Sequence, residues 1–297
     1  MVPRAIPVCG RGPLVRGLER NEAAPHAAAQ GAIDADDTAT SRLELVFGRE
    51  GVRRLAASKV VVFGVGGVGS SCVEALARGG VGRLVIVDGD AVQRSNVNRQ
   101  ALAFHSTVGR RKVEVMRAMV ADINPDAQVT ALDRFVLPDE VTALMDEIAA
   151  DADYVVDAVD TVGTKLAIAQ YADRRGLRLV SSMGAANKLR PDCFRFADIY
   201  QTSNDPLCRV VRKGARKRGI KRLEVLYSTE EPARLPVFED APDEEPAARA
   251  QGPHEAAAPQ DAPPRRRPTL GTASYAPPIM GQMMAGHVIR GLLGIKG

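Results

Sequence analysis

The sequence of 297 residues lacks several features that mark exported, membrane-bound or zinc-binding proteins. Its four cysteines form no Cys-x-x-Cys pair, which argues against a zinc knuckle or a thioredoxin-like redox centre. No apolar run approaches the roughly twenty residues of a membrane span. The amino terminus has no apolar segment of the kind found in a secretory signal. Scattered cysteines are typical of a reducing compartment, so we expect a cytoplasmic protein without zinc and without a membrane partner.

A strong overall charge is also missing, since the net charge is only +4. Local clustering is more informative, because eight of the fourteen residues from Arg209 to Arg222 are Lys or Arg. Such a run predicts a polyanionic partner, and a solvated helix face is the alternative. The run holds no aromatic residue, so contacts to a nucleic acid would be made to its backbone. The residues expected to make them are Arg212, Lys213, Arg216, Lys217, Arg218 and Lys221.

An apolar strand leads into a glycine-rich turn and a helix start at Val61-Val-Phe-Gly64-Val-Gly66-Gly67-Val-Gly69-Ser70. Glycines at such a turn let the backbone approach a phosphate, which the first N–H groups of the helix then bind. About twenty residues later a second apolar run ends at Asp88, where this kind of fold places an acid on the ribose hydroxyls. A carboxylate that only stabilises its turn is the alternative for Asp88, because Asp88-Gly89-Asp90 also has good turn chemistry.

Two cationic segments follow, Ser95-Asn-Val-Asn-Arg99-Gln and Thr107-Val-Gly-Arg-Arg-Lys112-Val. The planar fork of Arg99 suits phosphate oxygens, and Lys112 is a compact charge able to neutralise the β and γ phosphates. Solvated surface cations are the alternative. Asp160 ends a further apolar run at the sheet edge where ligands bind, and it is the candidate Mg²⁺ ligand, with helix capping as the alternative.

Alternating apolar and amphipathic segments predict an α/β fold with a Rossmann-like, doubly wound, mostly parallel sheet. Its carboxyl-terminal part is expected to be extended, partly antiparallel and closed by a final helix. The predicted strands are 59–63, 83–88, 127–132, 154–157, 178–182, 193–199 and 223–227, and the predicted helices are 70–79, 107–123, 138–149, 163–175 and 205–214. The expected organisation is a disordered leader over 1–40, a nucleotide-binding domain over 41–228, a Pro-, Ala- and acid-rich mobile loop over 229–272, and a helix over 273–297 that packs on the main domain.

The sequence also leads to predictions for one cysteine and one histidine. Cys208 lies beside the basic run and is the one cysteine to test as reactive, although no histidine is near it in sequence and most free cysteines are structural. His287 is expected on the exterior of the final helix.

Together these motifs resemble the adenylating domain of ubiquitin-activating-type enzymes, which activate a carboxylate as an acyl adenylate. Within that superfamily the chain is most similar to the family that dehydrates threonylcarbamoyladenosine in tRNA. The segments behind this narrower resemblance are 41–51, 181–188, 197–207 and 227–230. The resemblance covers the chain from about Ser41 to the final helix.

The resemblance implies ATP-dependent ring closure of threonylcarbamoyladenosine in tRNA, with AMP and pyrophosphate as products. Arg99, Lys112 and Asp160 would act in catalysis with Mg²⁺, Asn96 and Gln100 would contact the nucleotide, and Arg42 would reach the nucleotide of a second subunit in a homodimer. A monovalent cation near the site and a sulfur-transfer protein as partner stay open. The alternative is adenylation of the C-terminus of a ubiquitin-like sulfur carrier, which zinc-binding cysteines would favour.

Overall fold

The computed structural model describes residues 38–231, 233 and 270–295. The chain divides into two units, Met1–Ala39 and Thr40–Gly297, and the second unit holds all the elements below. Most of the predicted leader over 1–40 and of the predicted mobile loop over 229–272 lies outside the described residues. Those two boundaries therefore stay predictions.

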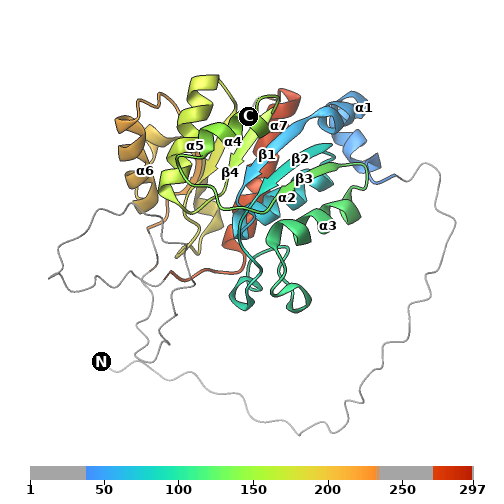
Figure 1. The fold of residues 1–297 in the computed structure, drawn as a ribbon, viewed down its shortest axis with the longest axis horizontal. Coiled ribbons are helices and arrows are strands. Elements are labelled where there is room, and N and C mark those ends of the chain that lie inside the picture. The colour runs from blue at the N-terminus through green and yellow to red at the C-terminus, as the bar shows by residue number, and fades with distance from the viewer. Residues whose placement is uncertain (1–37, 232, 234–269, 296–297) are drawn as a thin grey trace, which may run out of the picture. The chain divides into compact units, whose positions relative to one another are not determined.

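A seven-stranded sheet with the order β3-β2-β1-β4-β5-β7-β6 forms the centre of the fold (Figure 1). All neighbours are parallel except β6 and β7, which confirms the doubly wound sheet with a partly antiparallel carboxyl-terminal part. The strands are β1 Lys59–Phe63, β2 Arg83–Val87, β3 Gln128–Leu132, β4 Tyr154–Asp157, β5 Leu179–Ser182, β6 Phe194–Asp198 and β7 Glu224–Ser228. Each overlaps a predicted strand, because buried strands of a parallel sheet are runs of β-branched and apolar residues.

The α-helices are α1 Ser41–Ala57, α2 Gly67–Arg78, α3 Lys112–Ile123, α4 Val141–Ile148, α5 Val162–Arg175, α6 Pro206–Lys217 and α7 Ala276–Leu293. The prediction of a helix from residue 107 is wrong, because Gly109 has φ 87° and Arg111 is extended, so the helix starts at Lys112. Helix α1 was not predicted, since Gly48 with φ 70° interrupts its periodicity. None of the described helices is long and apolar enough to cross a bilayer.

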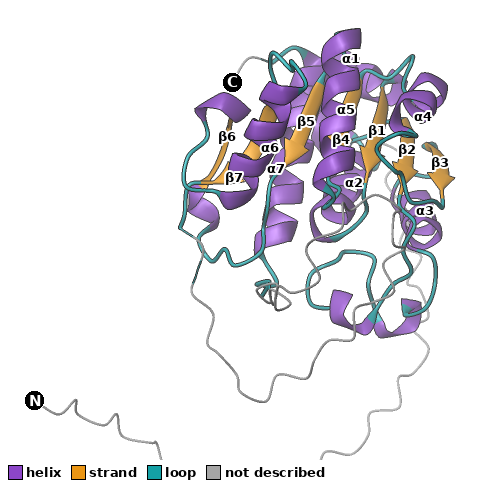
Figure 2. Ribbon diagram, turned by 60° about the vertical axis from the view of Figure 1, so that its left-hand side comes forward, coloured by secondary structure: helices purple, strands orange, loops and turns teal. Residues whose placement is uncertain are grey.

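The helices cover both faces of the sheet (Figure 2). Successive residues of a strand face opposite layers. Val60 and Val62 of β1 belong to the core formed with α2, α3 and α7. Val61 and Phe63 belong to the core formed with α4, α5 and α6. Burial on both faces is why these strands read as continuous apolar runs rather than as alternating ones.

Helix α7 returns from the carboxyl-terminal part of the chain and packs closely on α2, as predicted for a closing helix. A Cβ atom at Gly281 would lie 2.3 Å from the Val68 carbonyl oxygen, so only glycine allows this approach. The expectation that His287 is on the exterior is wrong. Its ring stacks on Phe196 at 4.4 Å between centroids, and its Nε2 is 3.1 Å from a carboxylate oxygen of Glu224.

Candidate functional site

The candidate site lies where the strand order reverses, between β1 and β4. The two strands are parallel, but the connections from their carboxyl ends lead to opposite sides of this point and leave a crevice, in which ligands bind in doubly wound folds. Gly64 follows β1 and Ala158 follows β4, and the Ala158 N–H donates to the Phe63 carbonyl at 2.8 Å. The glycine turn and the loop that carries Asp160 are therefore direct neighbours.

Two glycines of the turn are required by its geometry. Gly64 has φ 85°, and a Cβ atom there would lie 2.7 Å from the Ala158 carbonyl oxygen. A Cβ atom at Gly69 would lie 1.8 Å from the Gly64 carbonyl oxygen. The turn is folded tightly on the end of β4, and it presents the N-terminal N–H groups of α2 to the crevice.

Gly66 and Gly67 form the side of the turn that faces the predicted arginine segment. At Gly66 the nearest atom to a built Cβ would be the Gln100 amide nitrogen at 4.0 Å, and at Gly67 the Arg99 Cγ would lie at 3.4 Å. The structure thus brings Arg99 and Gln100 to the glycine turn from a segment about thirty residues away. The four predicted glycines and these two side chains form one site.

Asp88 sits at the end of β2 with both carboxylate oxygens engaged. One accepts from the Val65 N–H at 2.8 Å, and the other accepts from the Asp90 N–H at 2.8 Å. Burial raises the pKa of Asp88, while Lys112 and the two N–H groups act in the opposite direction. Asp88 therefore has the turn contacts expected for its alternative role. Each oxygen also keeps a lone pair for a ribose hydroxyl, and that role stays a prediction.

The two predicted phosphate-binding cations are both held by protein oxygens. Lys112 is nearly buried, and its Nζ lies 2.7 Å from Asp90 and 3.9 Å from Asp88. The Arg99 guanidinium donates to the Ser95 carbonyl at 2.7 Å and to the Asn98 side chain at 2.8 Å. A triphosphate in the crevice would therefore compete with these oxygens for the two cations.

Gln100 carries an unusual group, because its Oε1 is buried and has no hydrogen-bond partner among the residues that the structure describes. An unpaired buried acceptor is costly unless a ligand or water completes it. Since the other end of this amide faces Gly66, the orphan acceptor fits a donor brought by a nucleotide or its bound water. Asn96 has a different position: its Oδ1 accepts from the Gln93 N–H at 3.0 Å and caps the short turn Arg94–Asn96.

Asp160 is exposed at the carboxyl edge, where the Thr161 hydroxyl donates to it at 3.3 Å. Within the described ranges no group of three or more His, Cys, Asp or Glu side chains is placed to hold a metal ion. A single carboxylate fits Mg²⁺, which is bound in nucleotide sites through one or two carboxylates and the phosphates themselves. Any ion here, divalent or monovalent, would take most of its ligands from the nucleotide and water.

Sequence reasoning missed a buried charged cluster directly beneath this edge. Asp157 accepts from the Ser181 hydroxyl at 2.6 Å and from the Lys165 ammonium at 3.0 Å, and both ionised side chains are 1% exposed. The other Asp157 oxygen accepts from the Val159 N–H at 3.1 Å, so the cluster fixes the start of the loop that ends in Asp160. A signal was present, because Lys165 lies between the apolar residues of α5, where a solvated lysine is not expected.

Two further predicted residues, Arg42 and Cys208, lie outside the site of this chain. Arg42 is exposed near the start of α1, beside Leu43, which lies close to Gly80 past the far end of α2. The glycine turn is at the other end of α2, roughly 18 Å away along the helix axis, so Arg42 does not reach the site of its own chain. Cys208 is buried, and burial raises the pKa of its thiol to about 12. This favours the structural role expected of most free cysteines, because the nucleophilic form is a thiolate.

The basic run forms helix α6 and the turn after it. Lys213, Arg216, Lys217 and Lys221 are exposed there. Arg212 instead donates to the Thr202 carbonyl and hydroxyl at 2.9 and 2.8 Å, so its guanidinium binds the loop that precedes α6. Arg218 is half-buried and lines a separate cavity.

Comparisons with known proteins agree with this geometry. The ThiF family profile matches residues 40–297. The chain is 42% identical over 256 residues to the tRNA threonylcarbamoyladenosine dehydratase of Bacillus subtilis (strain 168), covering 85% of this chain and 94% of that protein. It is 38% identical over 174 residues to the corresponding protein of Escherichia coli (strain K12), covering 59% of this chain and 63% of that protein. The solved structure of the E. coli tRNA N6-threonylcarbamoyladenosine dehydratase in complex with ATP has a TM-score of 0.69 and 28% identity, covering 84% of this chain and 92% of that one.

Proposed function

Because this chain belongs to the ThiF family, we propose that it is an ATP-dependent dehydratase that closes a ring on threonylcarbamoyladenosine in tRNA. The observation that carries the proposal is the 42% identity to a protein of that activity over 94% of its length. The crevice between β1 and β4 is the ATP site, since the ATP-bound relative has the same fold and the glycine turn here presents free N–H groups.

The reaction has two steps that balance without an enzyme nucleophile. A carboxylate oxygen of the threonyl group attacks the α-phosphorus of ATP, the bond to the bridging oxygen of the β-phosphate breaks, and pyrophosphate leaves. The carbamoyl group of the same nucleoside then attacks the acyl carbon, loses a proton and expels AMP. The enzyme supplies position and charge, which agrees with a buried and protonated Cys208.

Each cation of the site has a place in the first step. Arg99 borders Gly67 and would hold oxygens of the α- and β-phosphates, while Lys112 would leave Asp90 to neutralise the departing pyrophosphate. Asp160 would hold Mg²⁺, which supplies charge neutralisation on the phosphates when bound. The orphan oxygen of Gln100 and the carboxylate of Asp88 would accept hydrogen bonds from the nucleotide.

The substrate RNA would contact the exposed cations of α6. Its backbone phosphates suit lysine and arginine side chains that no carboxylate of the described residues neutralises. We assign Lys213, Lys217 and Lys221 to this surface together with Arg216, whose guanidinium also lies 5.6 Å from the Tyr200 ring centroid.

A second copy of the chain would complete the site as a homodimer. Leu45 and Val46 on α1 are 78% and 73% exposed, and they adjoin Arg42 in sequence. Apolar side chains at such exposure favour a covered surface, and a partner α1 would carry its Arg42 toward the neighbouring nucleotide. The reaction balances without sulfur, so a sulfur-transfer protein would act as a regulator rather than as a reactant.

The decisive experiment incubates the purified protein with MgATP and threonylcarbamoylated tRNA. Nucleoside mass spectrometry under conditions that preserve a labile ring should show loss of one water, with AMP formed in equal amount. An ATP analogue with a methylene group between the α- and β-phosphorus is the matched control and should give no product. If no dehydrated nucleoside forms, but pyrophosphate exchanges into ATP when a ubiquitin-like carrier is added, the alternative substrate is correct.

A further inference from the structure

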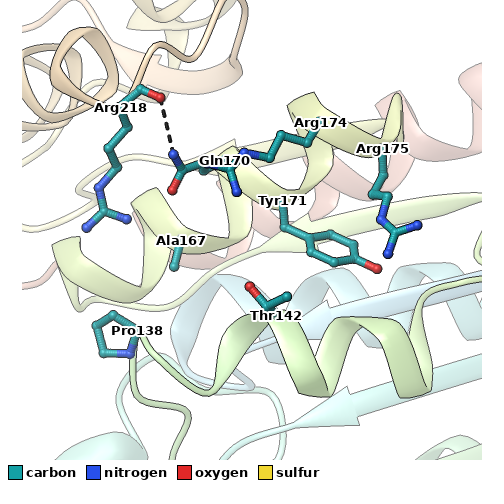
Figure 3. Close-up of a pocket in the computed structure, with 8 residues that line it drawn as sticks. All are labelled: Pro138, Thr142, Ala167, Gln170, Tyr171, Arg174, Arg175 and Arg218. Carbon is teal, nitrogen blue, oxygen red and sulfur yellow. Dashed lines mark hydrogen bonds between the residues drawn. The ribbon is translucent and has the colours of Figure 1, made fainter.

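A second polar cavity lies away from the nucleotide crevice, on the face of the sheet covered by α4, α5 and α6 (Figure 3). Its volume is about 260 Å³. Three arginines surround it, with hydroxyl, amide and apolar groups between them. Its lining consists of Pro138, Thr142, Ala167, Gln170, Tyr171, Arg174, Arg175 and Arg218.

The charge of this cavity is only partly balanced. Arg175 pairs with Asp146 at 2.7 Å, and the same carboxylate oxygen accepts from the Tyr171 hydroxyl at 2.6 Å. The guanidinium groups of Arg174 and Arg218 contact no carboxylate in the described part of the chain. Two positive charges therefore line the cavity without a carboxylate partner among the described residues, which favours an anionic ligand.

The cavity is held in shape by contacts between its walls. The Gln170 amide nitrogen of α5 donates to the Arg218 carbonyl at the end of α6 at 3.2 Å, which Figure 3 shows. The Lys221 N–H donates to Asp173 of α5 at 3.3 Å. The carboxyl-terminal ends of α5 and α6 are thus joined, which brings Arg174 and Arg218 to the same cavity.

The position of the cavity relates it to the RNA surface. Arg218 directly follows the exposed cations of α6, so the cavity continues that basic surface onto α5. Helix α5 begins two residues after Asp160, and Arg174 lies twelve residues along it, about 18 Å from its start. An RNA whose modified nucleoside enters the nucleotide crevice would need to extend only about three helical turns to reach this cavity.

We propose that the cavity between α4, α5 and the end of α6 binds backbone phosphate of the RNA substrate through Arg174 and Arg218. This inference rests on the proposed function for the identity of the RNA. It adds a binding site that anchors the substrate at a distance from the reacting nucleoside. The guanidinium of Arg175, which lies 5.4 Å from the Tyr171 ring centroid, would form the floor of the cavity.

The test compares Arg174→Gln/Arg218→Gln with Arg117→Gln/Arg290→Gln, which removes two exposed arginines of α3 and α7. Fluorescence anisotropy would measure tRNA affinity from 50 to 300 mM salt. We expect the cavity variant to raise the Kd about tenfold and to lower the salt slope by about one to two, with the control within about twofold of the parent. In turnover assays the cavity variant should raise KM for tRNA while kcat and KM for ATP stay unchanged.

An unchanged tRNA Kd in the cavity variant, or an equal loss in the control variant, would overturn the proposal. The same holds if the cavity variant only lowers the midpoint of thermal unfolding, because arginines in a last helical turn also stabilise the helix dipole. The proposed function is separable: a parent protein that binds tRNA through the cavity but forms no dehydrated nucleoside would remove the function and keep the site. Normal turnover together with an unchanged tRNA Kd in the cavity variant would keep the proposed function and remove the cavity as a binding site.

Discussion

At the scale of single residues, the proposed nucleotide site contains two cations held by carboxylate, carbonyl and amide oxygens. Lys112 lies between Asp90 and Asp88, and Arg99 is bound by oxygens of its own loop. These contacts keep both side chains in place. Breaking them costs little free energy when a triphosphate offers stronger acceptors. Their effect should therefore appear in chemistry rather than in folding.

Replacing either cation tests this directly. Lys112→Ala and Arg99→Ala should each lower the turnover number by about a hundredfold or more, the usual effect of removing one donor from a developing anion. Single-turnover formation of AMP would measure the loss, with circular dichroism as the check on folding. Arg94→Ala changes an exposed arginine of the same loop and should stay within about twofold of the parent. Near-normal turnover of either alanine variant would remove that cation from the phosphate site.

The buried cluster of Lys165, Asp157 and Ser181 should instead affect the stability of the fold. Lys165→Met would leave the Asp157 carboxylate without its counter-charge in a site 1% exposed, and the free energy of unfolding should fall by about 3 kcal/mol. Urea unfolding measures the change. Lys59→Met breaks the pair with the largely exposed Asp151 and should cost less than about 1 kcal/mol. Equal effects of the two substitutions would show that burial does not set the energy of the Lys165 pair.

At the scale of elements, the contact between α2 and α7 positions the glycine turn. Helix α7 begins against Gly67, where Pro277 would lie 2.8 Å from a Cβ atom, and it stays close to α2 as far as Ile289, whose Cδ1 would lie 2.6 Å from a Cβ atom at Gly79. The carboxyl-terminal helix thereby supports the first turn of the helix whose N–H groups face the nucleotide. A change in this packing should affect both stability and ATP binding.

Two glycines of α7 provide a matched pair. Gly281→Ala places a Cβ atom 2.3 Å from the Val68 carbonyl oxygen, and this overpacking should lower the free energy of unfolding by about 1–3 kcal/mol. Gly286 has no atom within 4 Å of such a Cβ, so Gly286→Ala should raise stability by up to about 1 kcal/mol through helix propensity. Chemical denaturation of both variants checks the pair, and destabilisation of equal size would contradict the packing argument.

The link between α7 and β7 should depend on pH. The hydrogen bond from His287 is the main cause of a lowered pKa of Glu224, with Arg222 acting in the same direction and burial opposing both. A carboxyl whose pKa is lowered on folding stabilises the protein above its ordinary value of 4.5 and loses this effect as the pH falls through its folded value. Tyr154 also faces the His287 ring.

Glu224→Gln measures this contribution, because glutamine resembles the protonated carboxyl. The parent should be more stable than the variant at pH 5.5, and the difference should shrink steadily as the pH is lowered from 4.5 toward 3. Unfolding curves at fixed temperature across this range give the comparison. A difference that is independent of pH would assign the contact to packing alone.

At the scale of the whole molecule, one chain does not bring all the predicted catalytic residues together. Arg42 lies at the end of α2 remote from the glycine turn, next to exposed apolar residues of α1. A homodimer that exchanges Arg42 between subunits would resolve this separation.

Hybrid dimers can test the exchange. Arg42→Ala and Lys112→Ala subunits should each be nearly inactive as homodimers. Doubly tagged hybrids of the two should recover about half of the parent activity, because one of their two sites then has both residues intact. Tandem affinity purification followed by the AMP assay makes the measurement. Hybrids as inactive as the homodimers would place Arg42 outside the partner's site.

The sequence by itself determined the strands, their parallel arrangement and the position of the nucleotide turn. Those features arise from local chemistry: runs of β-branched residues, glycines that alone permit the turn, and acids at strand ends. Arg99 and Lys112 could be proposed from their chemistry, since a planar guanidinium and a compact ammonium both suit phosphate oxygens.

Only the tertiary structure decided which polar groups meet. The pairing of Lys165 with Asp157, the inward direction of Arg212, the contact of His287 with Glu224 and the burial of Cys208 all depend on how separate elements pack together. Helix periodicity says which face of α5 or α7 is covered, but the covering residues come from other elements. The basic cavity between α4, α5 and α6 has the same origin, because its arginines become neighbours only when the two helix ends pack side by side.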